Sequence, residues 1–142
     1  MTEQNITAKI NEYIKKFGEK RNFNFMPLDE SGYTQVKRGS ASIGINVLTE
    51  QNVLLFLSYI MEVPKENELK FYRKILELNF LETSDAAFAI DRKTNKVYLR
   101  ALRVLTGLDY EEFEDMLDTI AKVADHWDDL LRVEFNKKPS EE

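Results

Sequence analysis

The feature that most constrains the fold is a run of nine residues, Val53 to Met61, that is apolar except at Ser58. It follows a segment, Ser40 to Leu48, in which Ile43, Ile45 and Val47 alternate with small or polar residues. Alternation of period two is typical of a strand with one buried face, and a short, nearly continuous apolar run is typical of a strand with neighbours on both sides. The sequence therefore predicts adjacent strands, with the second one central in its sheet or covered on both faces.

Two further segments are predicted strands of a meander. The first, Tyr33 to Arg38, alternates loosely. Thr49 to Asn52 is a polar turn that joins the two strands described above. Asn22 to Met26 is short and alternating, and we read it as an additional short strand near Phe25. Polar turns between short alternating segments predict antiparallel pairing.

Three segments, which lie before, between and after the groups of strands, have helical spacing, with apolar residues three and four positions apart. The first stripe ends at Gly18, which we interpret as the helix stop, and Asp109 is a suitable N-cap for the last helix. The expected stripes are Ile6, Ile10, Tyr13, Ile14 and Phe17; then Leu69, Tyr72, Ile75, Leu76 and Asn79; and finally Phe113, Met116, Leu117, Ile120, Ala124, Trp127 and Leu131.

A second hairpin lies between the last two helices. Residues 86–90 and 97–104 are the predicted strands, and the polar segment from Asp91 to Lys96 is the turn. Asp91 and Asn95 suit a turn because their side chains bond to nearby backbone N–H groups. With the short segment near Phe25 left out, the resulting order is α-β-β-β-α-β-β-α. This order predicts an α+β fold in a single domain over residues 1–135, followed by a polar, disordered tail at 136–142.

Composition excludes several function classes. The chain of 142 residues has no cysteine and a net charge of −5, which excludes disulfides and thiolate metal sites and disfavours binding to nucleic acid or anionic membranes. The longest apolar run is far shorter than the roughly 20 residues that span a bilayer. The polar first ten residues do not resemble a signal peptide, so a cytoplasmic protein is expected.

Catalytic and metal-binding motifs are also missing from the sequence. The one histidine, His126, shares a helix face only with Asp129 or Lys122, which is too few ligands for a metal site. The acidic run after Asp109 is explained by the positive end of the helix dipole. Phosphate-binding glycine motifs and nucleophile motifs are missing. We therefore predict no enzyme, no cofactor and no metal.

The apolar strands leave two interpretations open. Ile43, Ile45 and Val47 either form the core of the monomer or belong to a face that is open to a second copy or a client. The stripe of the last helix could likewise cover its own sheet or pack on another chain.

The second half of the sequence resembles a known family. From Leu69 to Leu131 it reads helix, Asn79-Phe80-Leu81-Glu82-Thr83, Ala87-Phe88-Ala89-Ile90-Asp91, Lys96-Val97-Tyr98-Leu99-Arg100, Gly107-Leu108-Asp109, then a long helix ending Ala124-Asp125-His126-Trp127. This pattern is similar to the type III secretion chaperones of the Tir-chaperone type and to the related YbjN-like proteins. The match covers about 60 residues, whereas the first half matches only in the order of its elements.

The resemblance implies a homodimer of small acidic subunits that binds an extended segment of a partner protein. In secretion chaperones the client lies over apolar patches of the first helix and the sheet, which places Ile10, Ile14, Ile43, Ile45 and Val47 as the expected partner-binding residues. The alternative is a stand-alone, YbjN-like regulator with an unknown partner. A third interpretation, a small-ligand domain or enzyme around His126, Tyr98 or Arg100, requires a concave pocket with converging polar groups.

Overall fold

The computed structural model describes residues 3–135. It contains three helices and five strands in the predicted order: α1 (Glu3–Lys20), β1 (Tyr33–Arg38), β2 (Ala41–Leu48), β3 (Val53–Glu62), α2 (Glu68–Leu81), β4 (Ala87–Asp91), β5 (Lys96–Val104) and α3 (Tyr110–Phe135). The predicted tail at 136–142 lies outside the described residues.

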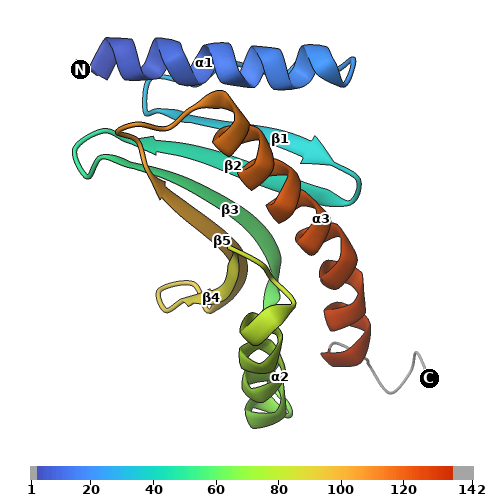
Figure 1. Ribbon diagram of the computed structural model, residues 1–142. Coiled ribbons are helices and arrows are strands. Elements are labelled where there is room, and N and C mark those ends of the chain that lie inside the picture. Colours follow the sequence, from blue (N-terminus) through green and yellow to red (C-terminus); the bar gives the residue numbers. More distant parts are fainter. Residues whose placement is uncertain (1–2, 136–142) are drawn as a thin grey trace.

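The five strands form one antiparallel sheet in the order β1-β2-β3-β5-β4 (Figure 1). β3, the strand with the continuous apolar run, is central, as the sequence predicts. It pairs with β2 on one side and β5 on the other, and its register with β5 shifts by one residue between Tyr59 and Met61. This bulge leaves both Ile60 and Met61 buried and increases the local bend of the strand.

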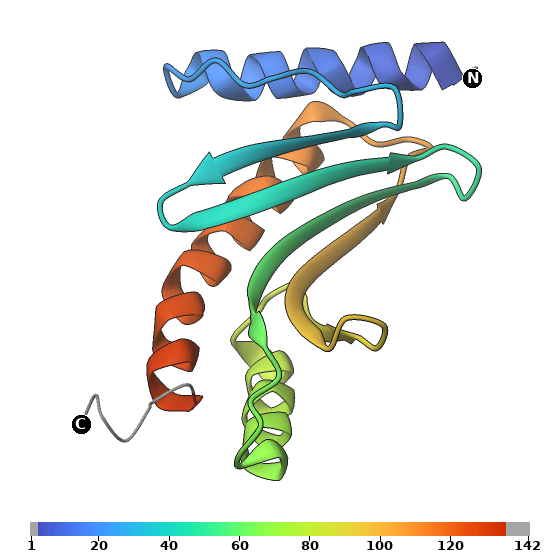
Figure 2. The same cartoon turned by 180° about the vertical axis from the view of Figure 1, so that it is seen from behind.

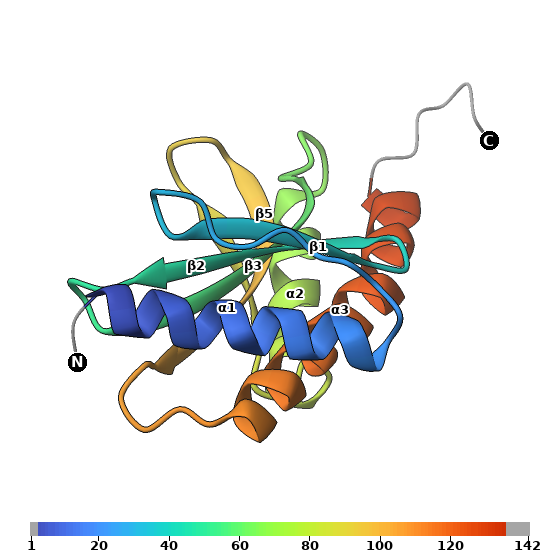
Figure 3. The same ribbon diagram turned by 90° about the horizontal axis from the view of Figure 1, so that it is seen from above.

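The long helix α3 covers one face of the sheet, crossing β2, β3 and β5. α1 lies beside the N-terminal half of α3 on the same side of the sheet (Figure 3). α2 stands at the other end of the molecule, next to β4 and the C-terminal end of α3 (Figures 1 and 2). The ring centroids of Phe71 in α2 and Phe135 in α3 are 5.1 Å apart.

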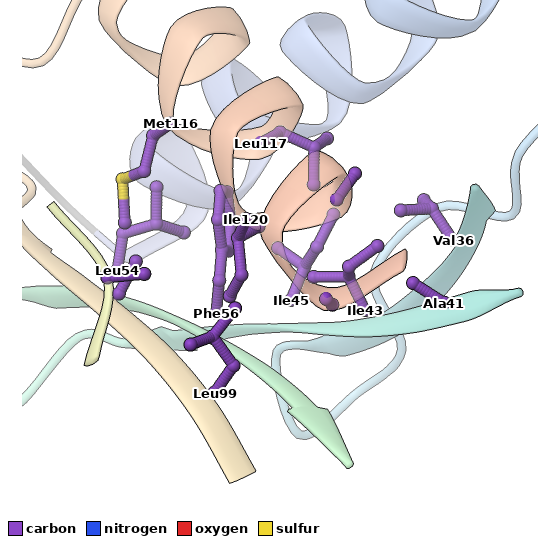
Figure 4. Close-up of a cluster of buried hydrophobic side chains, with 14 of the residues drawn as sticks. Val36, Ala41, Ile43, Ile45, Leu54, Phe56, Leu99, Met116, Leu117 and Ile120 are labelled. Carbon is purple, nitrogen blue, oxygen red and sulfur yellow. The ribbon is translucent and has the colours of Figure 1, made fainter. Parts of the chain in front are cut away.

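The core lies between α3 and the covered face of the sheet. Ile43, Ile45 and Phe56 point from the strands toward Leu117 and Ile120 of α3 (Figure 4), and all five are fully buried. The predicted stripe of α3 is the stripe that packs here, with Trp127 half-buried at its end. Its start is also as predicted: the Asp109 carboxylate accepts a hydrogen bond from the Glu112 N–H, 2.8 Å away, and Glu112 accepts one from the Asp109 N–H.

Two local predictions are wrong. α1 does not stop at Gly18 but continues to Lys20, and the glycine serves a close approach instead: a Cβ there would lie 2.6 Å from the Phe23 carbonyl oxygen. The segment from Asn22 to Met26 is not a strand. Its backbone is held by side chains, since the Thr34 hydroxyl donates to the Met26 carbonyl, and the Phe25 ring packs against Phe17.

Candidate interaction surfaces

The five residues expected to bind a partner are all buried. Ile10 and Ile14 face inward from α1, and Ile43, Ile45 and Val47 face α3 from β2; none is more than 4% exposed. They therefore do not line a patch open to solvent, and they form part of the core of the monomer. The physical reason is that α1 and α3 together cover the face on which the alternating residues of β2 lie. A partner could contact these residues only if α1 moved away, so their role in binding stays a prediction.

A polar cluster fastens α1 over that face. The Arg21 guanidinium, just after α1, lies 3.1 Å from the Glu114 carboxylate and 2.7 Å from that of Asp118, both on α3. The Tyr110 hydroxyl also donates to Glu114, over 2.9 Å. Burial, reinforced by this bond to a carboxylate, raises the pKa of Tyr110 to about 12. Partial burial opposes ionisation of Glu114, but hydrogen bonds from Lys20, Tyr110 and Arg21 outweigh it and hold its pKa below the ordinary value.

A second polar contact ties the β1–β2 turn to α3. The Asp125 carboxylate accepts hydrogen bonds from the Ser40 hydroxyl, at 2.6 Å, and from the Ser40 N–H, at 2.8 Å. These two bonds lower the pKa of Asp125. The same hydroxyl lies 2.8 Å from the buried carboxylate of Asp128. Both polar clusters therefore have a structural role: they hold the end of α1 and the β1–β2 turn against α3.

α2 carries the most exposed large apolar residues of the described chain. Its inner face buries Phe71, Ile75 and Leu78. On the opposite face, Leu69 is 84% exposed, Leu76 67% and Phe80 82%. We call this second face, together with Tyr72, the α2 stripe. A groove of about 570 Å³ runs along it. An amphipathic helix normally exposes charge on its outer side, so an apolar outer side of this size indicates an interface.

The single stripe predicted for this helix is thus wrong. It combined Ile75, which is buried, with Leu69 and Leu76, which are exposed. The apolar residues of this segment do recur every three or four positions, but they form two apolar faces of α2 rather than one. The signal was present in the composition: between Glu68 and Leu81, eight of the fourteen residues are Leu, Ile, Phe or Tyr, which exceeds what one face requires.

The other uncovered surface is the face of the sheet that points away from α1 and α3. Tyr59 and Leu102 are about half exposed there, and Leu55 and Leu57 are half-buried between them. We call this surface the open face. It belongs to the same strands whose other side forms the core, which explains why β3 is apolar on both sides.

The groups considered for chemistry do not assemble a reactive site. Among residues 3–135, no three or more His, Cys, Asp or Glu residues are grouped so that they could hold a metal ion. His126 is exposed and contacts the edge of the Trp127 ring. The Asp91 carboxylate accepts a hydrogen bond from the Lys93 N–H, as expected for a hairpin turn. Within the described part of the chain, no helix is long and apolar enough to cross a membrane.

A sheet covered on one face only, together with a helix that is apolar on both sides, makes this an α+β domain with apolar surfaces suited to binding another protein. The sequence also matches the model of a known family. Residues 12–128 match the model of the Tir chaperone protein (CesT) family. The chain belongs to this family, and the match includes the first half, where the sequence pattern alone gave only the order of the elements.

Solved structures agree with this assignment. A chain of the ExsC–ExsE complex is 26% identical, with a TM-score of 0.70, and the alignment covers 88% of this chain and 95% of that one. A chain of the ExoU–SpcU complex from the type III secretion system of Pseudomonas aeruginosa is 16% identical, with a TM-score of 0.61 and coverage of 86% and 93%. YbjN from E. coli is 14% identical, with a TM-score of 0.57 and coverage of 81% and 88%.

The family and the fold predicted from the sequence are thus confirmed. A search of curated proteins gave no match. The ExsC–ExsE and ExoU–SpcU structures are both complexes of two different proteins.

Proposed function

We propose that this protein is a cytoplasmic, non-enzymatic chaperone that works as a homodimer and binds an extended segment of a partner protein. The family match supports the chaperone class. The likeness to a chain of the ExsC–ExsE complex, at 26% identity over most of both chains, supports a protein as the client.

The single observation that carries the dimer is the α2 stripe. Leu69, Leu76 and Phe80 are spaced seven and four residues apart, so they lie on one side of the helix. A second copy of α2 packed against this side would remove three large side chains from water. Fully burying one such side chain is worth roughly 1.5–3 kcal/mol. The Arg73–Glu77 ion pair borders the groove and would lie at the rim of such an interface.

Mass in solution tests this proposal. We expect light scattering to give twice 16.7 kDa for the unmodified protein, and half that value for the variant Leu76→Asp at the same concentration. Met26→Asp is the matched control, because Met26 is 72% exposed and its segment is hydrogen-bonded to β1, at the edge of the sheet opposite β4, so the dimer should stay intact. A monomeric unmodified protein, or a Leu76→Asp variant that remains dimeric, would show that α2 is not the interface.

The client part of the proposal has its own test. The dimer should form a stable complex with the segment of a client, and the complex should protect that segment from proteolysis without changing it chemically. Recovery of a chemically altered partner would instead indicate an enzyme.

A further inference from the structure

The open face of the sheet has a groove that the register of the strands builds. Gly44 of β2 is the partner of Leu57 in β3, and Leu57 is in turn the partner of Arg100 in β5. Side chains of paired residues point to the same face of a sheet, so a row with no side chain at Gly44 leaves a depression beside Leu57. The Tyr33 ring covers one side of the depression and lies 3.0 Å from where a Cβ at position 44 would be.

Two hollows lie beside this row, and Arg100, as the strand partner of Leu57, borders them without lining either one. The first has a volume of about 380 Å³ and is lined chiefly by Tyr33, Gly44 and Tyr59. The second has a volume of about 280 Å³ and is lined by Ala89, Ile90 and Asp91. Leu57 and Tyr98 line both hollows, so the two are parts of one groove that extends from β2 to β4.

The middle of the open face carries one cation that no carboxylate of the described residues neutralises. The chain carries −5, but Arg100 stands in the middle of β5 with Leu57 and Ala87 as its partners, and no acidic side chain of the described residues pairs with it. Four other arginines, at positions 21, 73, 103 and 132, each lie within 4.0 Å of a carboxylate. Lys96, at the end of the groove, lies 5.5 Å from the centre of the Tyr59 ring. Its strand partners Glu62 and Asp91 are acidic, so Arg100, unlike Lys96, has no acidic strand partner.

All arginines carry the same bidentate donor group. Arg100 differs from those four in that its neighbours are apolar and no carboxylate of the described residues accepts its hydrogen bonds. Guanidinium pairs most strongly with carboxylate, and does so best where apolar neighbours exclude water. The complement of this surface is a segment that is apolar and acidic. Neither the α2 stripe, which lies at the end of the molecule, nor α3, which covers the other face, supplies such a segment.

The length of the groove fits an extended chain. β2 and β4 are separated by three strand spacings, or roughly 14 Å, and an extended segment spans about 13 Å between residues i and i+4. In such a segment, residues i, i+2 and i+4 face the same way. Building on the proposed function, we propose that the open face binds an extended segment of the partner in which apolar residues at i and i+4 enter the two hollows and an Asp or Glu at i+2 pairs with Arg100.

Two synthetic peptides test this docking mode on the full-length protein. Each contains the core Leu-Ser-X-Ser-Leu with capped termini, where X is Glu in one and Lys in the other. Affinity is measured by fluorescence anisotropy, and the site by changes in backbone amide chemical shifts. We expect the Glu peptide to bind about tenfold more tightly than the Lys peptide, and to shift the amides of Leu57, Tyr98 and Arg100.

The variant Arg100→Glu should reverse the preference, so that the Lys peptide binds more tightly than the Glu peptide. Lys15→Glu is the control: it makes the same change of net charge at an exposed position on α1 and should leave the preference unchanged. Binding without preference, shifts confined to α2, or failure of both peptides to bind would overturn the docking mode. If the protein is nevertheless a dimer that holds a protein client, the proposed function stands and only the docking face is wrong.

Discussion

The two faces of the sheet are built from the same strands but differ in what covers them. Along β3, Leu54, Phe56 and Ile60 are fully buried under α3, whereas Leu55, Leu57 and Tyr59 on the alternate positions stay partly in water. Hydrophobicity alone does not separate the two sets, because both are apolar. The covered face therefore stabilises the monomer, whereas the open face leaves in water the apolar area that the proposed docking mode uses.

The largest expected effect comes from truncating the covered face. Phe56→Ala removes a fully buried ring that meets Phe113 edge to face, with centroids 5.6 Å apart. Such truncations cost about 3–5 kcal/mol of unfolding free energy. The matched variant on the other face, Leu102→Ala, should cost less than about 1 kcal/mol because the side chain is already half exposed. Urea denaturation measures both, and equal losses would remove the distinction between the faces.

A smaller loss of unfolding free energy should follow from weakening the contact between α1 and α3, the two helices that cover the sheet. Arg21→Met keeps an unbranched side chain but deletes the guanidinium, whose carbon lies 3.7 Å from the centre of the Phe17 ring, and with it both ion pairs to α3. We expect a loss of about 1–2 kcal/mol in unfolding free energy, and faster hydrogen exchange in α1 than in the strands. Arg73→Met is the control, because its ion pair is highly exposed. Unchanged exchange in α1 would mean that apolar packing alone fixes the cover.

The smallest expected effect depends on pH. The pKa of Glu114 is lowered in the folded protein from an ordinary value of 4.5, so the folded state binds its proton less readily than the unfolded state. The stability that this carboxylate contributes is therefore complete above pH 4.5 and is lost as pH falls through the lower, folded-state pKa. The unmodified protein should lose more stability in that range than Glu114→Gln does. Parallel curves of midpoint temperature against pH would contradict this assignment.

The sequence predicted the elements whose surroundings are simple. The stripe of α3 meets one surface, and the central position of β3 follows from its continuous apolar run, so periodicity was sufficient for both. The prediction was wrong where an element meets two surfaces. In α2, Ile75 packs inward and Leu76 outward, and a helical period cannot tell which of two apolar sides finds a partner within the chain.

The predicted binding residues show the same limit. Alternation correctly grouped Ile43, Ile45 and Val47 on one face, but which face α3 covers depends on contacts more than 60 residues apart in the sequence. The groove of the open face depends on register, since Gly44, Leu57 and Arg100 form a row only once β2, β3 and β5 are aligned. No local pattern carries that information.

One side chain of α2 has a consequence for the rim of the sheet. Asn79 accepts a hydrogen bond from the Phe88 N–H at 2.8 Å and donates one to the Phe88 carbonyl at 3.3 Å, so its amide takes the place of a neighbouring strand at the outer edge of β4. An unpaired edge invites uncontrolled addition of strands from other molecules. Here a single carboxamide occupies that edge at Phe88, so a strand from another molecule could not pair along β4 without first displacing the Asn79 side chain.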